Sequence, residues 1–144
     1  MDEGRAWLAK AAITELITRY AALSDAGDWE ALAALYTDDG RMSRPTAPDD
    51  FVVGRAAILQ AFRARPRRAA RHIVANVLVT LDGDSGARAS SQILLFMGVA
   101  QGDGPAALST TPPLIGTYHD RLVRAVRGWC FAERRGSLDF RAPE

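Results

Sequence analysis

Apolar side chains in the first part of the chain recur at the spacing of an amphipathic helix. Its wide apolar face comprises Leu8, Ala12, Ile13, Leu16, Ile17, Tyr20 and Leu23. The pattern predicts a helix of about five turns, with a stop at Gly27 and the N-cap of a further helix at Asp28. That second, short helix is expected to carry an apolar face of Trp29, Leu32, Leu35 and Tyr36.

Turn residues interrupt the pattern between residues 37 and 66. The run Thr37-Asp38-Asp39-Gly40 predicts the end of the second helix, and a short strand is expected from Arg41. The stretch 45–50 has two prolines and two aspartates and is interpreted as a loop. A third helix is expected from about Arg55 to Ala64, because Pro66 lies just past its end. It would bury Ile58, Leu59 and Phe62.

From Ala69 onward the period changes to two, which is typical of β-strands. One face of the first such strand carries His72, Val74, Asn76 and Leu78. The other face carries Ile73, Ala75, Val77, Val79 and Leu81. A hairpin turn at 82–86 leads into a second strand at 88–100. One face of this second strand carries Ser91, Ile93, Leu95 and Met97.

The last third of the chain continues the sheet after an interruption. Residues 101–113 are rich in Gly, Pro and Thr and predict a loop, which could act as a lid. Strands are expected at 114–126 and 129–135, the second with Trp129 and Phe131 facing inward. The tail, residues 136–144, carries Leu138 and Phe140, which are expected to fold back onto the body.

Three helices followed by an antiparallel meander predict an α+β fold. We expect a single domain over residues 1–144, with a curved antiparallel sheet of four to six strands around the long N-terminal helix. A concave apolar space would lie between sheet and helix. Because the first long strand is apolar on both faces, a second copy of the chain is expected to cover it, in a homodimer or a trimer.

Composition narrows the classes of function. The chain has 144 residues, 48% hydrophobic and 24% charged, as is ordinary for a globular domain. One cysteine, Cys130, and two histidines rule out an intramolecular disulfide and a Cys/His zinc cluster. No apolar run reaches the roughly 20 residues of a membrane span, and the first residues lack a secretory signal pattern, so a cytoplasmic protein is expected.

The net charge of +1 argues against a dedicated nucleic-acid binder, although arginines cluster locally. The cluster comprises Arg63, Arg65, Arg67, Arg68 and Arg71, with no acidic residue between them. No aromatic residues alternate with the arginines to stack on bases. We interpret the run as a solvated helix end and loop, with an anion-steering patch as the alternative.

The strongest candidate for chemistry is the pair Asp25 and His72. Asp25 lies in the last turn of the first helix, where the helix dipole disfavours a carboxylate. Residues that break local rules tend to mark functional sites. His72 is the one histidine expected to face inward, and an imidazole can both accept and donate a proton near neutral pH. The alternatives are a histidine bonded to a core carbonyl and an ordinary aspartate at a helix end.

The order of these elements, together with a series of short motifs, resembles the SnoaL-like branch of the nuclear-transport-factor-2-like superfamily. The motifs are Ile17-Thr18-Arg19-Tyr20, Asp25-Ala26-Gly27-Asp28-Trp29, Leu35-Tyr36-Thr37-Asp38-Asp39-Gly40, Gly54-Arg55, Arg71-His72 with Asn76, and Gly116-Thr117-Tyr118-His119-Asp120 through Gly128-Trp129. The resemblance implies a cone-shaped α+β barrel with a pocket at its open end, usually in a dimer or trimer.

Within the superfamily the chain is most similar to the scytalone dehydratase-like group and to the small subunits of ring-hydroxylating dioxygenases. The dehydratases pair a helix-end aspartate with a pocket histidine that acts as general acid and base, and Asp25 and His72 match these positions. Other pocket positions depart from the dehydratase pattern, namely Met97, Ser24, Arg44, Gly116 and Tyr118. Scytalone itself is therefore not expected to be the substrate.

Further side chains are candidates for substrate binding beside the pair. Asn76 or Tyr118 could hold a developing oxyanion, the alternatives being a core amide and a rim aromatic. Arg44 could bind an anionic group or extend into solvent. The remaining candidates are expected to shape the pocket wall or core: Tyr20, Trp29, Phe62, Leu95 and Met97.

Two functions remain open on the sequence. The first is a cofactor-independent lyase or isomerase that binds no metal and acts on a hydrophobic carbonyl or polyketide-like molecule by dehydration, isomerisation or cyclisation. The second is a non-catalytic ligand-binding or scaffold subunit. Neither reading requires nucleic acid or a membrane as partner.

Overall fold

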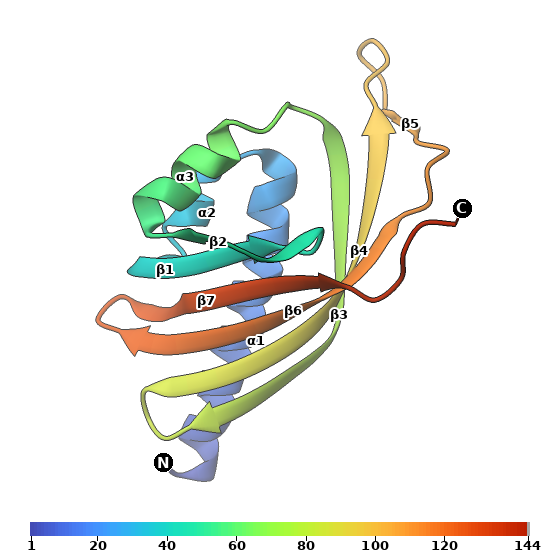
Figure 1. Ribbon diagram of the computed structural model, residues 1–144. Helices are drawn as coiled ribbons and strands as arrows, with labels where there is room; N and C mark the ends of the chain where they lie inside the picture. Colours follow the sequence, from blue (N-terminus) through green and yellow to red (C-terminus); the bar gives the residue numbers. More distant parts are fainter. Residues whose placement is uncertain (144) are drawn as a thin grey trace.

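The computed structural model describes residues 1–143 and opens with helix α1, Glu3–Ala26 (Figure 1). The Asp2 side chain caps its start by accepting a hydrogen bond from the backbone N–H of Arg5 at 2.8 Å. Gly27 ends it with a left-handed φ of 70°, and its N–H binds the carbonyls of Leu23 and Ser24. The predicted stop is confirmed, and it places Asp25 in the last helical turn.

The buried face of α1 differs from the predicted one near the N-terminus. Leu8 and Ala12 are exposed, whereas the face in contact with the core comprises Ala9, Ile13, Leu16, Ile17, Tyr20 and Ala21. A spacing of four residues drifts by about 40° per step around a helix with 3.6 residues per turn. The row through Leu8 and Ala12 therefore turns away from the sheet, and the first turns of α1 extend beyond it (Figure 1).

Two short helices and two strands complete the first half of the chain. Helix α2, Trp29–Ala33, is capped by Asp28 as predicted, and α3, Arg55–Arg63, ends one residue before the predicted boundary. Strand β1, Tyr36–Arg44, begins where the second helix was expected to continue. Strand β2, Ala47–Val53, occupies the predicted loop. Its proline is tolerated because β2 forms an edge of the sheet.

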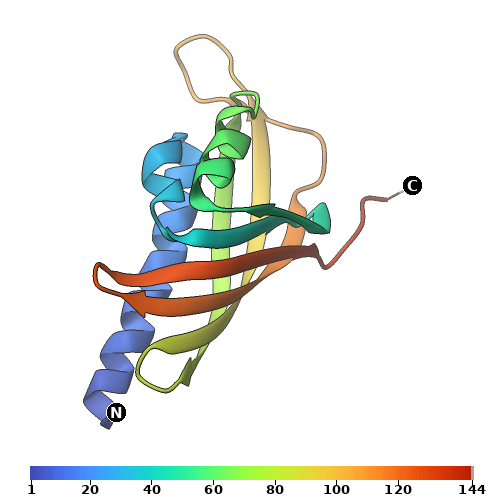
Figure 2. The ribbon, with the colours of Figure 1, turned by 60° about the vertical axis from the view of Figure 1, so that its left-hand side comes forward.

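The strands form one strongly curved sheet in the order β2-β1-β7-β6-β4-β3, and β5 pairs with β4 (Figure 2). The remaining bounds are β3 Ala69–Asp82, β4 Gly86–Val99, β5 Ala107–Leu108, β6 Leu114–Ala125 and β7 Gly128–Leu138. Neighbouring strands run antiparallel except β1 and β7, which are parallel. The expected purely antiparallel sheet is therefore mixed, because α3 and the β2 hairpin intervene between β1 and the later meander.

A β-bulge in β3 reverses part of the predicted alternation. The pairing with β4 shifts between Ala75 and Leu78, and Asn76 adopts a positive φ of 52°, which asparagine tolerates better than most residues. Beyond the bulge Val77, Val79 and Leu81 pack on the core. Leu78 is 70% exposed, so the prediction that it shares a face with His72 is wrong.

A second register shift lies between β6 and β7, where Arg121 pairs with Glu133 but Leu122 pairs with Phe131. Ala132 is the additional residue, so Phe131 and Arg134 both point into the core. The tail does not fold back as predicted, since Leu138 and Phe140 are exposed and residues 140–143 lead away from the sheet (Figure 1). Within residues 1–143, no helix is both long and apolar enough to cross a membrane.

Candidate functional site

Asp25 and His72 meet where the end of α1 lies against the start of β3. The His72 Nδ1 lies 2.6 Å from Asp25 Oδ1, and the backbone N–H of His72 donates to Asp25 Oδ2 at 3.0 Å. Each side chain is only 13% exposed. Because a carboxylate accepts hydrogen bonds, the neutral imidazole carries its proton on Nδ1, which leaves the Nε2 lone pair free.

The local sequence explains why a carboxylate is held at an unfavourable helix end. The last turn of α1 contains no basic residue, so nothing on the helix itself compensates Asp25. Compensation comes from β3, through the N–H and ring of His72 and through Arg71, whose Nε lies 3.7 Å from Asp25 Oδ2. The aspartate therefore orients the histidine and fixes the start of β3 against α1.

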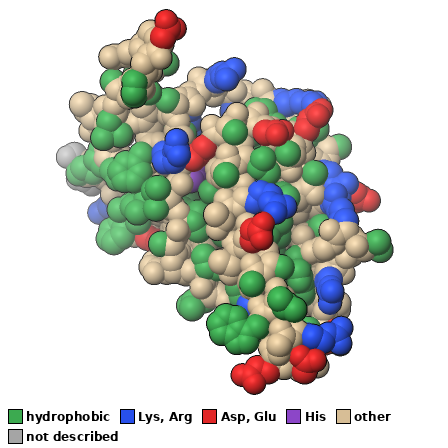
Figure 3. All heavy atoms as spheres, turned by 180° about the vertical axis from the view of Figure 1, so that it is seen from behind, with side chains coloured by type: hydrophobic (Ala, Val, Ile, Leu, Met, Phe, Trp, Pro, Cys, Tyr) green, Lys and Arg blue, Asp and Glu red, His purple; other side chains and the backbone are tan. Residues whose placement is uncertain are grey.

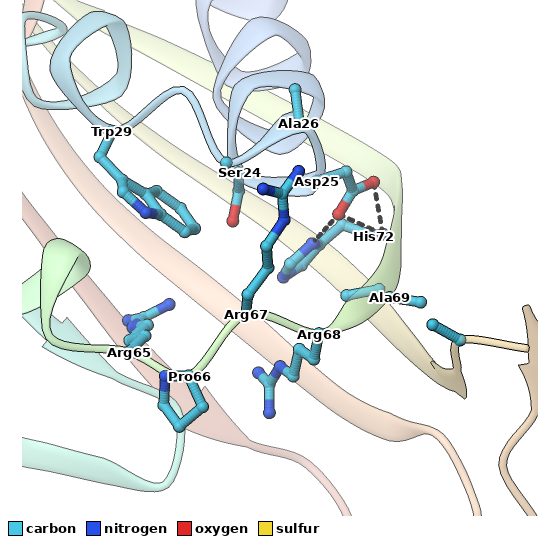
Figure 4. Close-up of a pocket in the computed structure, with 13 residues that line it drawn as sticks. Ser24, Asp25, Ala26, Trp29, Arg65, Pro66, Arg67, Arg68, Ala69 and His72 are labelled. Carbon is cyan, nitrogen blue, oxygen red and sulfur yellow. Dashed lines mark hydrogen bonds and ion pairs between the residues drawn. The ribbon is translucent and has the colours of Figure 1, made fainter. Parts of the chain in front are cut away.

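The pair opens into a cavity of about 490 Å³ between the end of α1 and the segment that leads into β3 (Figure 4). This volume falls within the range that small-molecule sites occupy. The wall consists of the end of α1 with Trp29, of residues 65–68 between α3 and β3, and of the first residues of β3. In Figure 4 the His72 ring points into the space that these segments enclose. Figure 3 shows a histidine recessed between basic and acidic side chains on the face opposite to that of Figure 1.

Three arginines of the predicted solvated run line this cavity: Arg65, Arg67 and Arg68. The interpretation as a solvated helix end holds for Arg63, which pairs with Glu30 at 2.6 Å. Arg65 is partly buried, with its guanidinium 4.4 Å above the ring of Phe62. Burial and the neighbouring Arg44 lower the pKa of Arg65.

A second charged pair, absent from the sequence-based predictions, lies deeper in the cone. Arg134 binds Asp120 through two parallel bonds, Nε to Oδ1 at 2.8 Å and Nη2 to Oδ2 at 2.9 Å. Their side chains are 1% and 0% exposed. The guanidinium also lies 4.3 Å from the ring centroid of Tyr20, 3.9 Å from that of Tyr118 and 4.5 Å from that of Phe131.

The three tyrosines differ in the contacts of their hydroxyls, and none of them lines the cavity within residues 1–143. Tyr20 and Tyr36 bind one another through their hydroxyls at 2.9 Å, and burial raises the pKa of both. Burial also raises the pKa of Tyr118, while Arg134 and Arg65 lower it. Within residues 1–143 the Tyr118 hydroxyl makes no hydrogen bond, so it remains an available donor.

The other predicted pocket residues are dispersed. Trp29 lines the cavity and stacks on Phe62 with ring centroids 5.4 Å apart, whereas Phe62 itself is in the core. Leu95 is buried opposite His72 in the sheet. Tyr20 belongs to the core cluster, and Met97 lines a separate depression beside β5.

Two polar candidates lie outside the cavity wall. Asn76 is exposed and binds Gln92, because the bulge turns it away from the face of His72. The prediction that Asn76 faces the same side as His72 is therefore wrong. Arg44 is exposed and donates to the carbonyl of Ala61 at 3.3 Å, in agreement with the alternative that it extends into solvent. Within residues 1–143, no group of three or more His, Cys, Asp or Glu side chains is arranged to hold a metal ion.

Solved structures share this architecture. A nuclear-transport-factor-2-like protein with a cystatin-like fold from Novosphingobium aromaticivorans is 26% identical, with a TM-score of 0.77, over 94% of this chain and 84% of that chain. A predicted scytalone dehydratase from the same organism is 21% identical, with a TM-score of 0.80, over 99% of this chain and 96% of its own. A Catenulispora acidiphila protein in complex with S-DNPA is 27% identical, with a TM-score of 0.68, over 90% and 92% of the two chains.

None of the curated proteins compared with the sequence matches it. A family model described as a SnoaL-like domain matches residues 5–135, which is nearly the whole chain. That family includes polyketide cyclases and dehydratases, so the chain has a family-level role as an enzyme or a binder of small hydrophobic ligands. The chain belongs to the SnoaL-like domain family.

Proposed function

We propose that the protein is a cofactor-independent enzyme that moves a proton next to the carbonyl of a hydrophobic small molecule. The reaction class is dehydration, isomerisation or cyclisation. The observation that carries this proposal is the geometry of His72: Nδ1 is held by Asp25 at 2.6 Å while the ring points into the cavity. A histidine oriented by a carboxylate, with its second nitrogen facing a ligand-sized space, is suited to general acid–base catalysis.

In this mechanism the Nε2 atom of His72 takes a proton from the carbon beside the carbonyl. The electron pair of the broken C–H bond moves onto the carbonyl oxygen, which becomes an enolate. Asp25 stabilises the imidazolium that results, because its carboxylate already binds Nδ1. The imidazolium then returns the proton, to a leaving hydroxyl in a dehydration or to another carbon in an isomerisation.

Tyr118 is the candidate donor to the developing oxyanion. Its hydroxyl makes no hydrogen bond within residues 1–143, and its raised pKa keeps the proton on the phenol at neutral pH. Tyr118 does not itself line the cavity, but Asp25 and Arg65, which do, both influence the pKa of its phenol. A preorganised donor at the developing charge is typically among the largest contributions to catalysis.

The test uses deuterium exchange at the acidic carbon of a cyclic aromatic ketone, 1-tetralone, followed by proton NMR in heavy water. We expect the wild-type protein to accelerate exchange above the buffer rate. His72→Ala should lower the enzymatic rate by about 10²- to 10⁴-fold, the range that a positioned acid–base group contributes.

His119 offers a matched control, since it is the other histidine of the chain and is exposed on the far side of β6 from Tyr118. The variant His119→Ala should keep the wild-type exchange rate. Exchange at the buffer rate with wild-type protein, or equal rates for His72→Ala and wild type, would contradict the proposal.

A further inference from the structure

Arg65 is a cation at the cavity wall that the protein leaves without an anionic partner. Its Nε atom is buried, and within residues 1–143 nothing accepts a hydrogen bond from it. In the same part of the chain, no carboxylate pairs with Arg65, Arg67 or Arg68, whereas eight of the other fourteen arginines have a carboxylate partner. Because an unsatisfied buried donor is costly, this arrangement suggests a partner that arrives from outside the chain.

The single carboxylate of the cavity wall does not neutralise these arginines. Asp25 already accepts from the backbone and ring of His72, and Arg71 lies 3.7 Å from it. The cavity therefore combines three unpaired guanidinium groups with one engaged carboxylate. Such an excess of positive charge attracts anions, and the planar fork of arginine matches a carboxylate through two parallel bonds.

The surroundings of Arg65 are aromatic. The guanidinium lies 4.4 Å from the ring centroid of Phe62, and Phe62 is stacked with Trp29 at an interplanar angle of 10°. Trp29 and Arg65 both line the cavity, so a flat apolar surface and a fixed cation face the same space (Figure 4). These contacts hold the guanidinium in place before a ligand binds, which lowers the entropic cost of binding.

We propose that the ligand of this cavity is an aromatic carboxylic acid whose carboxylate binds Arg65 while its ring system lies against Trp29. The inference rests on the proposed function only in sharing its cavity, and it narrows the substrate class to acids. Arg67 and Arg68, which are more exposed, attract the anion to the cavity, whereas Arg65 binds it directly.

The test compares two probes of nearly equal shape, 1-naphthaleneacetate and its neutral primary amide, by isothermal titration calorimetry. We expect wild-type protein to bind the carboxylate about tenfold more tightly, as one charge-assisted hydrogen bond allows. Arg65→Gln should abolish this preference. Arg63→Gln is the matched control, because Arg63 lies two residues away, is paired with Glu30 and does not line the cavity.

The binding site is checked by NMR of the two histidine rings. Naphthaleneacetate should shift the resonances of His72 and leave those of the exposed His119 unchanged. Equal affinities for carboxylate and amide, a preference that persists in Arg65→Gln, or an effect confined to His119 would overturn the inference. The binding measurement does not depend on turnover. If the protein prefers the carboxylate but does not accelerate deuterium exchange, only the proposed function is refuted. If it accelerates exchange but binds carboxylate and amide equally, only this inference is refuted.

Discussion

The cone contains two acid–base pairs with opposite designs. Asp120–Arg134 is sealed. Both side chains are fully buried, two parallel hydrogen bonds join the guanidinium to the carboxylate, and three aromatic rings surround the guanidinium. Asp25–His72 is open, because Nδ1 of the imidazole binds Asp25 whereas Nε2 faces the cavity. A pair whose hydrogen bonds are all used internally can only support structure, whereas a pair with one free atom can exchange protons with a ligand.

The largest effect is expected from breaking the sealed pair. Arg134→Met leaves Asp120 as an unpaired charge in the core, so the free energy of unfolding should fall by about 3–5 kcal/mol in chemical denaturation. Replacing both partners, Asp120→Leu with Arg134→Met, should recover most of this loss because no charge remains buried.

Arg135 provides the matched control one residue further along β7. It pairs with Asp49 at 3.1 Å, but these side chains are 37% and 89% exposed. Arg135→Met should therefore cost no more than about 1 kcal/mol. Similar losses of stability for the Arg134 and Arg135 variants would contradict the conclusion that the buried Asp120–Arg134 pair supports the structure more than an exposed ion pair does.

The second prediction concerns the open pair. It tests whether Asp25 orients the His72 ring without contributing much to the stability of the protein. In Asp25→Asn the backbone N–H of His72 should bind the amide oxygen, which turns the amide N–H₂ toward Nδ1. The ring must then accept on Nδ1 and carry its proton on Nε2, which cannot act as a base. Exchange activity should fall by about 100-fold, equivalent to ~2.7 kcal/mol, while stability changes little.

The measurement is ¹⁵N NMR of the imidazole, which distinguishes the two tautomers directly. Wild-type His72 should show the proton on Nδ1, and Asp25→Asn should show it on Nε2. An unchanged tautomer with lost activity would mean that Asp25 acts in some way other than by orienting the ring.

Much of the fold follows from local sequence signals, and the exceptions have identifiable causes. Gly27 and Asp28 set a helix end and a helix start by backbone chemistry that needs no tertiary context, and the hairpin at 82–86 does the same for β3 and β4. Strand β2 escaped prediction because Pro48 and two aspartates resemble a loop unless the strand is known to lie at an edge.

The parts of the site that escaped prediction depend on register. Simple alternation from Trp129 and Phe131 places Glu133 inside, and only the additional residue at Ala132 brings Arg134 opposite Asp120. The same kind of shift moved Asn76 out of the predicted site. Arg65 lies in a segment without periodicity, so nothing in the sequence indicated its burial. Asp25 was predictable because a carboxylate at a helix C-terminus breaks a local rule.

The third prediction concerns the ionisation of the three tyrosines, and its effect at neutral pH is the smallest. The chain has three tyrosines, and burial raises the pKa of each above the ordinary value of 10.0. Below about pH 10 the phenols are protonated in both the folded and the unfolded chain, so stability is fully present. Above that pH the unfolded chain ionises first, so unfolding releases protons and stability falls as pH rises.

Ultraviolet difference spectra of tyrosinate, recorded with circular dichroism, should therefore show no normally titrating tyrosine in the folded protein. Tyrosinate should form together with the loss of folded structure, because Tyr20 and Tyr36 lie in the core cluster and cannot ionise without opening it. Within residues 1–143, Tyr118 alone of the three tyrosines lacks a hydrogen-bond partner for its hydroxyl, so it should be the first to ionise. If one tyrosine titrates before unfolding and Tyr118→Phe removes that step, the phenol is accessible from the open side of the cone. If the early step survives in Tyr118→Phe, Tyr20 or Tyr36 is accessible instead, and the sealed region is not closed to solvent.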